Sequence, residues 1–155
     1  MAPGATTLLL RSSAVLWVVW GSFHLLLGIA LMAFIGAEHP IGQLSEIPEL
    51  LEVTMMDNPA RFASVASLKQ HAYNLAWIGA VVTVGAGFVW KGDPRGIFFN
   101  AVVAGFADLG YFIFFDLAGY ADPPGPQMTW ICVGAIVLSL VAYFGARPGA
   151  SRPHN

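Results

Sequence analysis

The chain has 155 residues, of which 57% are hydrophobic and 10% are charged, and its formal net charge is −2. Soluble globular proteins carry about 25% charged residues, so this composition, with a mean hydropathy of +0.68, excludes an ordinary water-soluble domain. No basic patch suggests nucleic acid as a partner. The single cysteine, Cys132, excludes a disulfide framework and a cysteine-rich metal site.

Four apolar runs are each long enough to cross a hydrocarbon core of about 30 Å, which takes about 20 helical residues. They cover residues 14–35, 72–90, 97–117 and 128–146. None alternates like a barrel strand, and backbone groups in lipid must be hydrogen-bonded internally. The first run contains His24 and exceeds the roughly 7–15 apolar residues of a signal core, so it is a transmembrane helix. We predict an all-α integral membrane protein with one four-helix transmembrane domain over residues 1–155.

The basic residues predict how the chain crosses the membrane. Four spans place both termini on one side, and Lys and Arg are enriched on the cytoplasmic side. Five of the seven basic residues fall on the side of the termini: Arg11, Lys91, Arg95, Arg147 and Arg152. The other side has Arg61 and Lys69 and most of the acidic residues. We therefore predict a multi-pass protein of the cell membrane with cytoplasmic termini and a long extracytoplasmic loop over residues 36–68.

The segments between the spans carry their own signals. Residues 91–96, with Pro and Gly, predict a tight turn that makes the second and third helices antiparallel neighbours. Residues 44–56 are spaced like a short surface helix, or form a loop with one helical turn. A cap residue followed by proline at the first helical position is indicated by Asp57, Asn58 and Pro59. The second helix is therefore expected to begin before its apolar run. Residues 122–126 predict a rigid loop before the fourth helix.

Two ionisable side chains, His24 and Asp108, fall near the middle of the first and third spans. These two helices run in the same direction, and the two residues lie at similar distances from the helix starts. At about 1.5 Å per residue they reach the same depth. A carboxylate that faced lipid there would cost about 3 kcal/mol, so Asp108 is expected to face inward and either to pair with His24 or to stay protonated.

Other polar residues extend this site toward the surface. Tyr111 shares the helix face of Asp108, one turn farther along, and small residues at Gly21 and Gly28 flank His24. The expected route then continues through polar residues nearer the extracytoplasmic side: Asn74, His71, Asp116, Tyr120 and Lys69. Together they predict a polar path that is open to the outside and closed toward the cytoplasm.

Each of these residues also has a purely structural interpretation. His24 and Asp108 can fasten two helices, Asn74 can join one helix to another, and an interfacial His71 can simply contact water. Residues 79–87 place Gly79, Thr83 and Gly87 at intervals of four, a pattern that favours close helix packing within the monomer, or else a dimer face.

Motifs of several enzyme classes are missing from the sequence. It has no phosphate loop, no zinc-protease motif and no serine in a nucleophile elbow. His71 lies about 10 Å above His24 by residue counting, which does not suit one haem held between them. No cofactor and no metal are predicted.

Three functions fit this inventory. The first is a pocket of His24, Asn74, Asp108, Tyr111 and His71 that binds or transports a small apolar molecule, with proton linkage as an option and a homo-oligomer or larger membrane complex expected for transport. The second is an intramembrane isomerase or cyclase in which His24 and Asp108 are the catalytic base and acid toward a lipid-like substrate. The third is an accessory subunit of a membrane complex whose polar residues only join helices.

Overall fold

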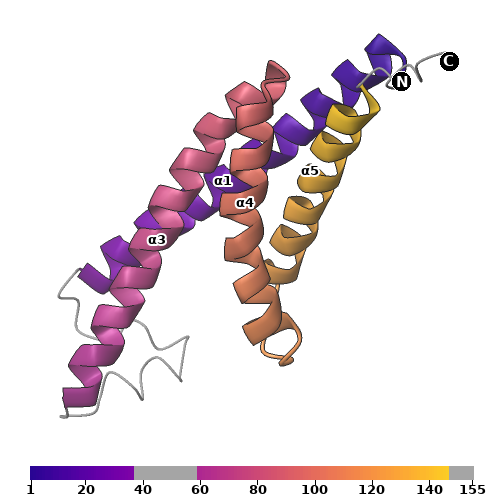
Figure 1. The fold of residues 1–155 in the computed structure, drawn as a ribbon. Coiled ribbons are helices and arrows are strands. Elements are labelled where there is room, and N and C mark those ends of the chain that lie inside the picture. Colours follow the sequence, from indigo (N-terminus) through magenta and orange to yellow (C-terminus); the bar gives the residue numbers. More distant parts are fainter. Residues whose placement is uncertain (37–58, 147–155) are drawn as a thin grey trace, which may run out of the picture.

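The computed structural model describes residues 1–36 and 59–146 and contains four long helices (Figure 1). They are α1 (Pro3–Gly36), α3 (Pro59–Trp90), α4 (Pro94–Tyr111) and α5 (Gly125–Gly145), and α4 continues into a short π-helix, η2 (Phe112–Asp116). All four are long and apolar enough to cross a membrane, and no strand occurs in the described residues. The predicted all-α fold, with four helices long and apolar enough to span a membrane, is therefore confirmed in the described residues.

Two helices extend well beyond the predicted apolar runs. α1 has 34 residues and α3 has 32, so each is about 50 Å long, whereas the hydrocarbon core of a membrane is about 30 Å thick. α1 begins at Pro3 rather than near residue 14, because a criterion based on apolar runs detects only the part suited to lipid. α3 begins at Pro59, where the capping pattern predicted it. The expected surface helix over 44–56 lies outside the described residues.

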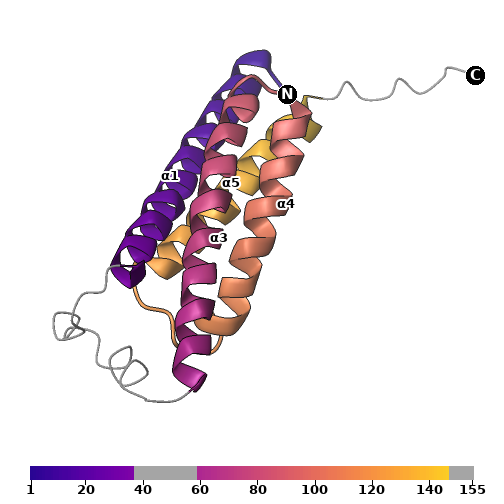
Figure 2. The ribbon, with the colours of Figure 1, turned by 90° about the vertical axis from the view of Figure 1, so that its left-hand side faces the viewer.

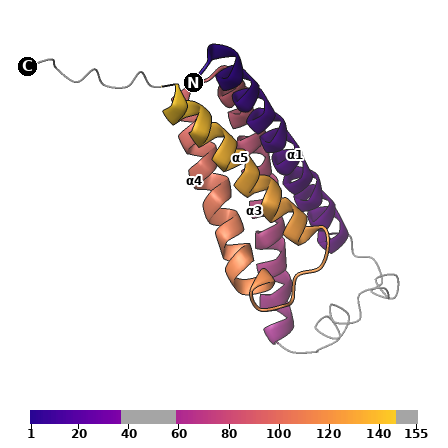
Figure 3. The same cartoon turned by 90° about the vertical axis from the view of Figure 1, so that its right-hand side faces the viewer.

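The four helices form a ring in which each one packs mainly against two others. α1 lies against α3 and α5, and α4 lies against the same two helices from the opposite side (Figures 2 and 3). The start of the chain meets the end of α5, where the amino group of Met1 donates to the carbonyl of Gly145 over 3.0 Å. α3 and α4 are joined at this same end and diverge toward the other end (Figure 1).

α1 and α3 approach each other closely because small residues line their contact. A methyl group added at Gly28 would overlap the backbone of Ala72 and Ala76, and one added at Gly79 would overlap the backbone of α1. Thr83 packs against Gly21. The small residues predicted to pack within the monomer do so at Gly79 and Thr83, whereas Gly87 faces open space.

The predicted tight turn between α3 and α4 is also confirmed. Asp93 caps α4 by accepting the backbone N–H of Arg95 over 2.9 Å, and Gly92 supplies the left-handed backbone at φ +73°. The hydrogen bonds from Arg95 lower the pKa of the Asp93 carboxyl. One turn into α4, the buried amide of Asn100 donates to the carbonyl of Val82 over 3.1 Å, and Gly85 leaves the space for that amide.

The bundle is tightly packed in what we call the terminal half: the start of α1, the end of α3, the start of α4 and the end of α5. Trp17 is fully buried there, and the hydroxyl of Ser13 donates across to the carbonyl of Ala135 on α5 over 2.7 Å. Ser139 is also fully buried and donates to carbonyls of its own helix. Large apolar side chains face outward on every helix, as contact with lipid requires.

Candidate functional site

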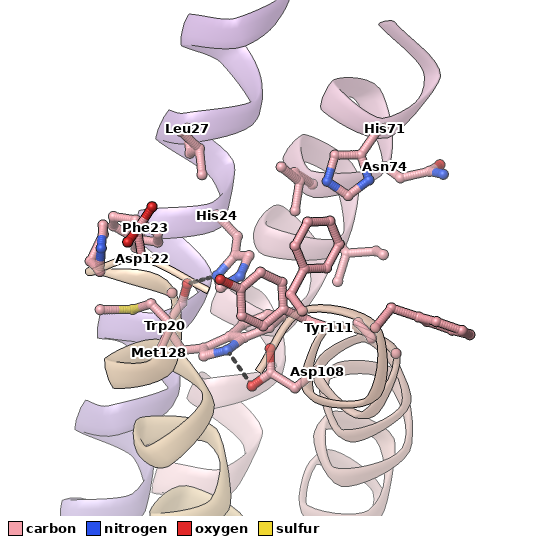
Figure 4. Close-up of a pocket in the computed structure, with 18 residues that line it drawn as sticks. Trp20, Phe23, His24, Leu27, His71, Asn74, Asp108, Tyr111, Asp122 and Met128 are labelled. Atoms are coloured by element: carbon pink, nitrogen blue, oxygen red, sulfur yellow. Dashed lines mark hydrogen bonds between the residues drawn. The ribbon is translucent and has the colours of Figure 1, made fainter. Parts of the chain in front are cut away.

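A cavity of about 740 Å³ lies in the opposite half of the bundle, which we call the cavity half. All five residues nominated from the sequence line it: His24, His71, Asn74, Asp108 and Tyr111 (Figure 4). The remaining wall residues come from every helix and from the connection before α5: Trp20, Phe23, Leu27, Leu75, Ile78, Ala107, Gly110, Phe114, Phe115, Asp122, Pro124, Gly125 and Met128. Its volume is in the range of sites for small molecules, and its walls are mostly apolar with a few polar groups.

Asp108 is the deepest charged group of this cavity. It lies on the inner face of α4 with 8% of its surface exposed, and its Oδ2 accepts the indole N–H of Trp20 over 3.0 Å. The side chain of Cys132, on α5, lies close to the same carboxyl. The expectation that Asp108 faces inward is therefore confirmed, and a carboxyl at this depth has neighbours from two other helices.

His24 is held by its own helix. Its Nδ1 lies 2.8 Å from the backbone carbonyl of Trp20, and a carbonyl can only accept, so Nδ1 carries the hydrogen. The imidazole stacks on the indole of Trp20, with ring centroids 3.8 Å apart and an interplanar angle of 24°. Its other nitrogen, Nε2, has no partner among the described residues and remains available to a molecule in the cavity.

The direct His24–Asp108 pair that the sequence suggested is not formed in the described structure. Figure 4 shows Trp20 between the two residues, bonded to Asp108 through its side chain and to His24 through its backbone. Trp20 lies one helical turn before His24 on the same face of α1, and its long indole reaches the carboxyl. Trp20 thus bonds to both side chains, and Nε2 of the imidazole and the remaining lone pairs of the carboxyl can each form hydrogen bonds of their own.

Tyr111 forms the wall next to α5. Its ring stacks on that of Phe115, with centroids 5.1 Å apart and an angle of 7° between the planes. Its hydroxyl lies directly against Gly125, where a methyl group would collide with it. Phe115 belongs to η2, whose wider turn places side chains four positions apart, such as those of Tyr111 and Phe115, above one another. π-helical turns are frequent at functional sites, and this one directly follows the segment that carries Asp108.

The two nominated residues of α3 lie nearer the end of the bundle. Asn74 is half-buried, and its Oδ1 accepts the indole N–H of Trp77 over 3.1 Å. Its hydrogen bond therefore stays within α3, and the interpretation that it joins two helices is not supported. His71 is exposed on the same helix, one turn earlier. The residues expected farther along the route, Lys69, Asp116 and Tyr120, do not line the cavity.

Sequence reasoning missed Trp20 and Cys132, which lie next to Asp108. A signal for Trp20 was present, since it precedes His24 by four residues and so had to share its face. Within the described part of the chain, no group of three His, Cys, Asp or Glu side chains is arranged to hold a metal ion.

No family model, curated protein or solved structure matches this chain. What the cavity can bind must therefore be inferred from its own residues.

Proposed function

We propose that this protein binds, or carries across part of the membrane, a small and largely apolar molecule in the cavity between His24, Asp108 and Tyr111. The observation that carries the proposal is that side chains from all four helices, far apart in sequence, converge on one cavity of about 740 Å³. A bundle that needed polar groups only to join its helices would bury them against backbone carbonyls, as the terminal half does with Ser13, Asn100 and Ser139.

The proposal includes a direction. Three of the described basic residues, Arg11, Lys91 and Arg95, lie in the terminal half, whereas Arg61 and Lys69 lie near the other end of α3, and an excess of positive charge favours the cytoplasmic side. The cavity then opens toward the extracytoplasmic side of the cell membrane. The buried contacts around Trp17 and Ser13 close the bundle on the cytoplasmic side.

The test is native mass spectrometry of the gently solubilised protein, which reports the number of subunits and any retained molecule together. We expect an apolar molecule to be retained by the wild type and to be lost from Asp108→Asn. The matched control is Asp93→Asn on the same helix, where an exposed carboxylate caps the helix and Asn caps equally well. Retention by both variants, or a bare wild-type protein that purifies only with a partner subunit, would contradict the proposal.

A second candidate function is an intramembrane acid/base enzyme of the isomerase or cyclase type. The observation that favours it is that His24 Nε2 and Asp108 face one cavity without bonding each other, as a separate base and acid require. Incubation in heavy water distinguishes the two functions. An enzyme introduces deuterium at a carbon atom of the retained molecule, and His24→Gln stops this; a binding protein introduces none.

A further inference from the structure

The charged groups around the cavity are all of one sign. Asp108 lies at the deep end and Asp122 lies in the connection before α5, and no Lys or Arg of the described residues lines the cavity. Among the described residues, the other titratable groups of the wall are His24, His71 and Tyr111. A buried carboxylate is stabilised by a cation and repels an anion, so the cavity does not suit fatty acids or phosphates.

The hydrogen-bond inventory at the deep end points the same way. The indole N–H of Trp20 is already donated to Asp108, and the Nδ1–H of His24 is already donated to a backbone carbonyl. The thiol of Cys132, a weak donor, lies close to the same carboxyl. What remains next to Asp108 and His24 is acceptor capacity, in the free lone pairs of the carboxylate and Nε2 of the neutral imidazole, while the Tyr111 hydroxyl and the Asn74 amide nitrogen can still donate. A fitting head group must therefore bring N–H or O–H donors.

The aromatic walls favour a positively charged donor over a neutral one. The rings of Trp20 and His24 stack as one layer (Figure 4), and those of Tyr111 and Phe115 stack as another. A cation next to the faces of such rings gains electrostatic attraction, which increases when water is excluded. The apolar residues beyond them, such as Leu27, Ile78 and Met128, leave room for a hydrocarbon body.

We propose that the cavity selects apolar molecules that carry one protonated amine, with the ammonium group seated between Asp108 and His24 Nε2. This inference rests on the proposed binding function and adds the chemical class of the ligand. The ammonium donates to the carboxylate and to the imidazole, while the hydrocarbon body lies along the apolar walls.

The test compares three probes with the same alkyl chain: dodecylamine, dodecan-1-ol and dodecanoic acid. Each is titrated into the purified protein in lipid nanodiscs, and bound fractions are read by native mass spectrometry, with Asp93→Asn as the control for attraction of amines to any acidic surface. We expect dodecylamine to bind at least about tenfold more tightly than the alcohol, because hydrogen bonds to charged groups are about twice as strong as neutral ones. The acid should bind least.

Asp108→Asn should reduce binding of the amine at least about tenfold and change binding of the alcohol much less, because the amide oxygen of Asn still accepts a neutral O–H donor. Equal binding of the amine and the alcohol to the wild type, or an amine preference that survives Asp108→Asn, would overturn the inference while leaving the binding function intact. Tightest binding of the acid would overturn it too. If no probe binds and the wild type retains no molecule, both the inference and the proposed function are wrong.

Discussion

The two halves of the bundle use polar side chains in different ways. In the terminal half, Ser13, Asn100 and Ser139 are fully buried and each donates to a backbone carbonyl inside the protein. In the cavity half, His24 and Asp108 are held by neighbours but keep acceptor atoms that face open space. We therefore interpret a polar residue of these helices as part of the proposed ligand site when its remaining hydrogen-bonding capacity faces the cavity, and as a packing contact when it does not.

The largest expected effect comes from adding a leucine side chain at a closely packed glycine and, for comparison, at a glycine that lines the cavity. Gly28→Leu would insert a side chain into the backbone of Ala72 and Ala76, so we expect it to destabilise the fold by at least about 3 kcal/mol. Gly110 lines the cavity and has nothing near its missing side chain, so Gly110→Leu should leave the fold intact and displace the bound molecule. Thermal unfolding followed by circular dichroism measures the first effect, and native mass spectrometry measures the second.

Gly87→Leu is the control for both variants, because Gly87 faces open space on α3 away from the cavity. It should change neither stability nor retention. If Gly28→Leu proves as stable as Gly87→Leu, α1 and α3 do not pack as closely at Gly28 as described. If Gly110→Leu still retains the molecule, that molecule binds somewhere else.

A smaller effect separates two buried tryptophans. Trp17 and Trp20 are both fully buried on α1, but only the indole N–H of Trp20 has an acceptor, whereas that of Trp17 has no partner among the described residues. Trp20→Phe should therefore cost about 1–2 kcal/mol more stability than Trp17→Phe, although the two changes remove the same ring atoms. The midpoints of thermal unfolding in detergent measure this difference. Equal losses would show that the bond from Trp20 to Asp108 contributes nothing.

The smallest effect concerns the cap of α4, at the end opposite the cavity. Arg95 lowers the pKa of Asp93 below its ordinary value of 3.8, so the folded state favours the carboxylate. The resulting stability is present above pH 3.8 and is lost as the pH falls through the lowered pKa. Wild type should unfold at a slightly higher temperature than Asp93→Asn at neutral pH, and the difference should vanish in acid. A difference that grows in acid would contradict this sign.

The sequence predicted the spans well because lipid imposes a strict condition on length and polarity, which residues 72–90 and 128–146 satisfy visibly. It did not predict the start of α1 at Pro3 or the π-helical turn at Phe112–Asp116, since neither changes the apolar pattern. For the site, equal depth correctly brought His24 and Asp108 to one cavity. The depth of a residue in the membrane does not show how far its side chain extends, however. The position of Trp20 between His24 and Asp108 was therefore not predicted.

The most direct test of this account compares two polar residues of α4, eight positions apart. Native mass spectrometry should be used to measure cavity occupancy in Asp108→Asn and in Asn100→Leu, each relative to the wild type. Asn100 donates to Val82 in the terminal half, so its loss should leave occupancy unchanged, whereas loss of the Asp108 carboxylate should empty the cavity. If both variants retain the molecule, or both lose it, the two halves do not differ in the way proposed.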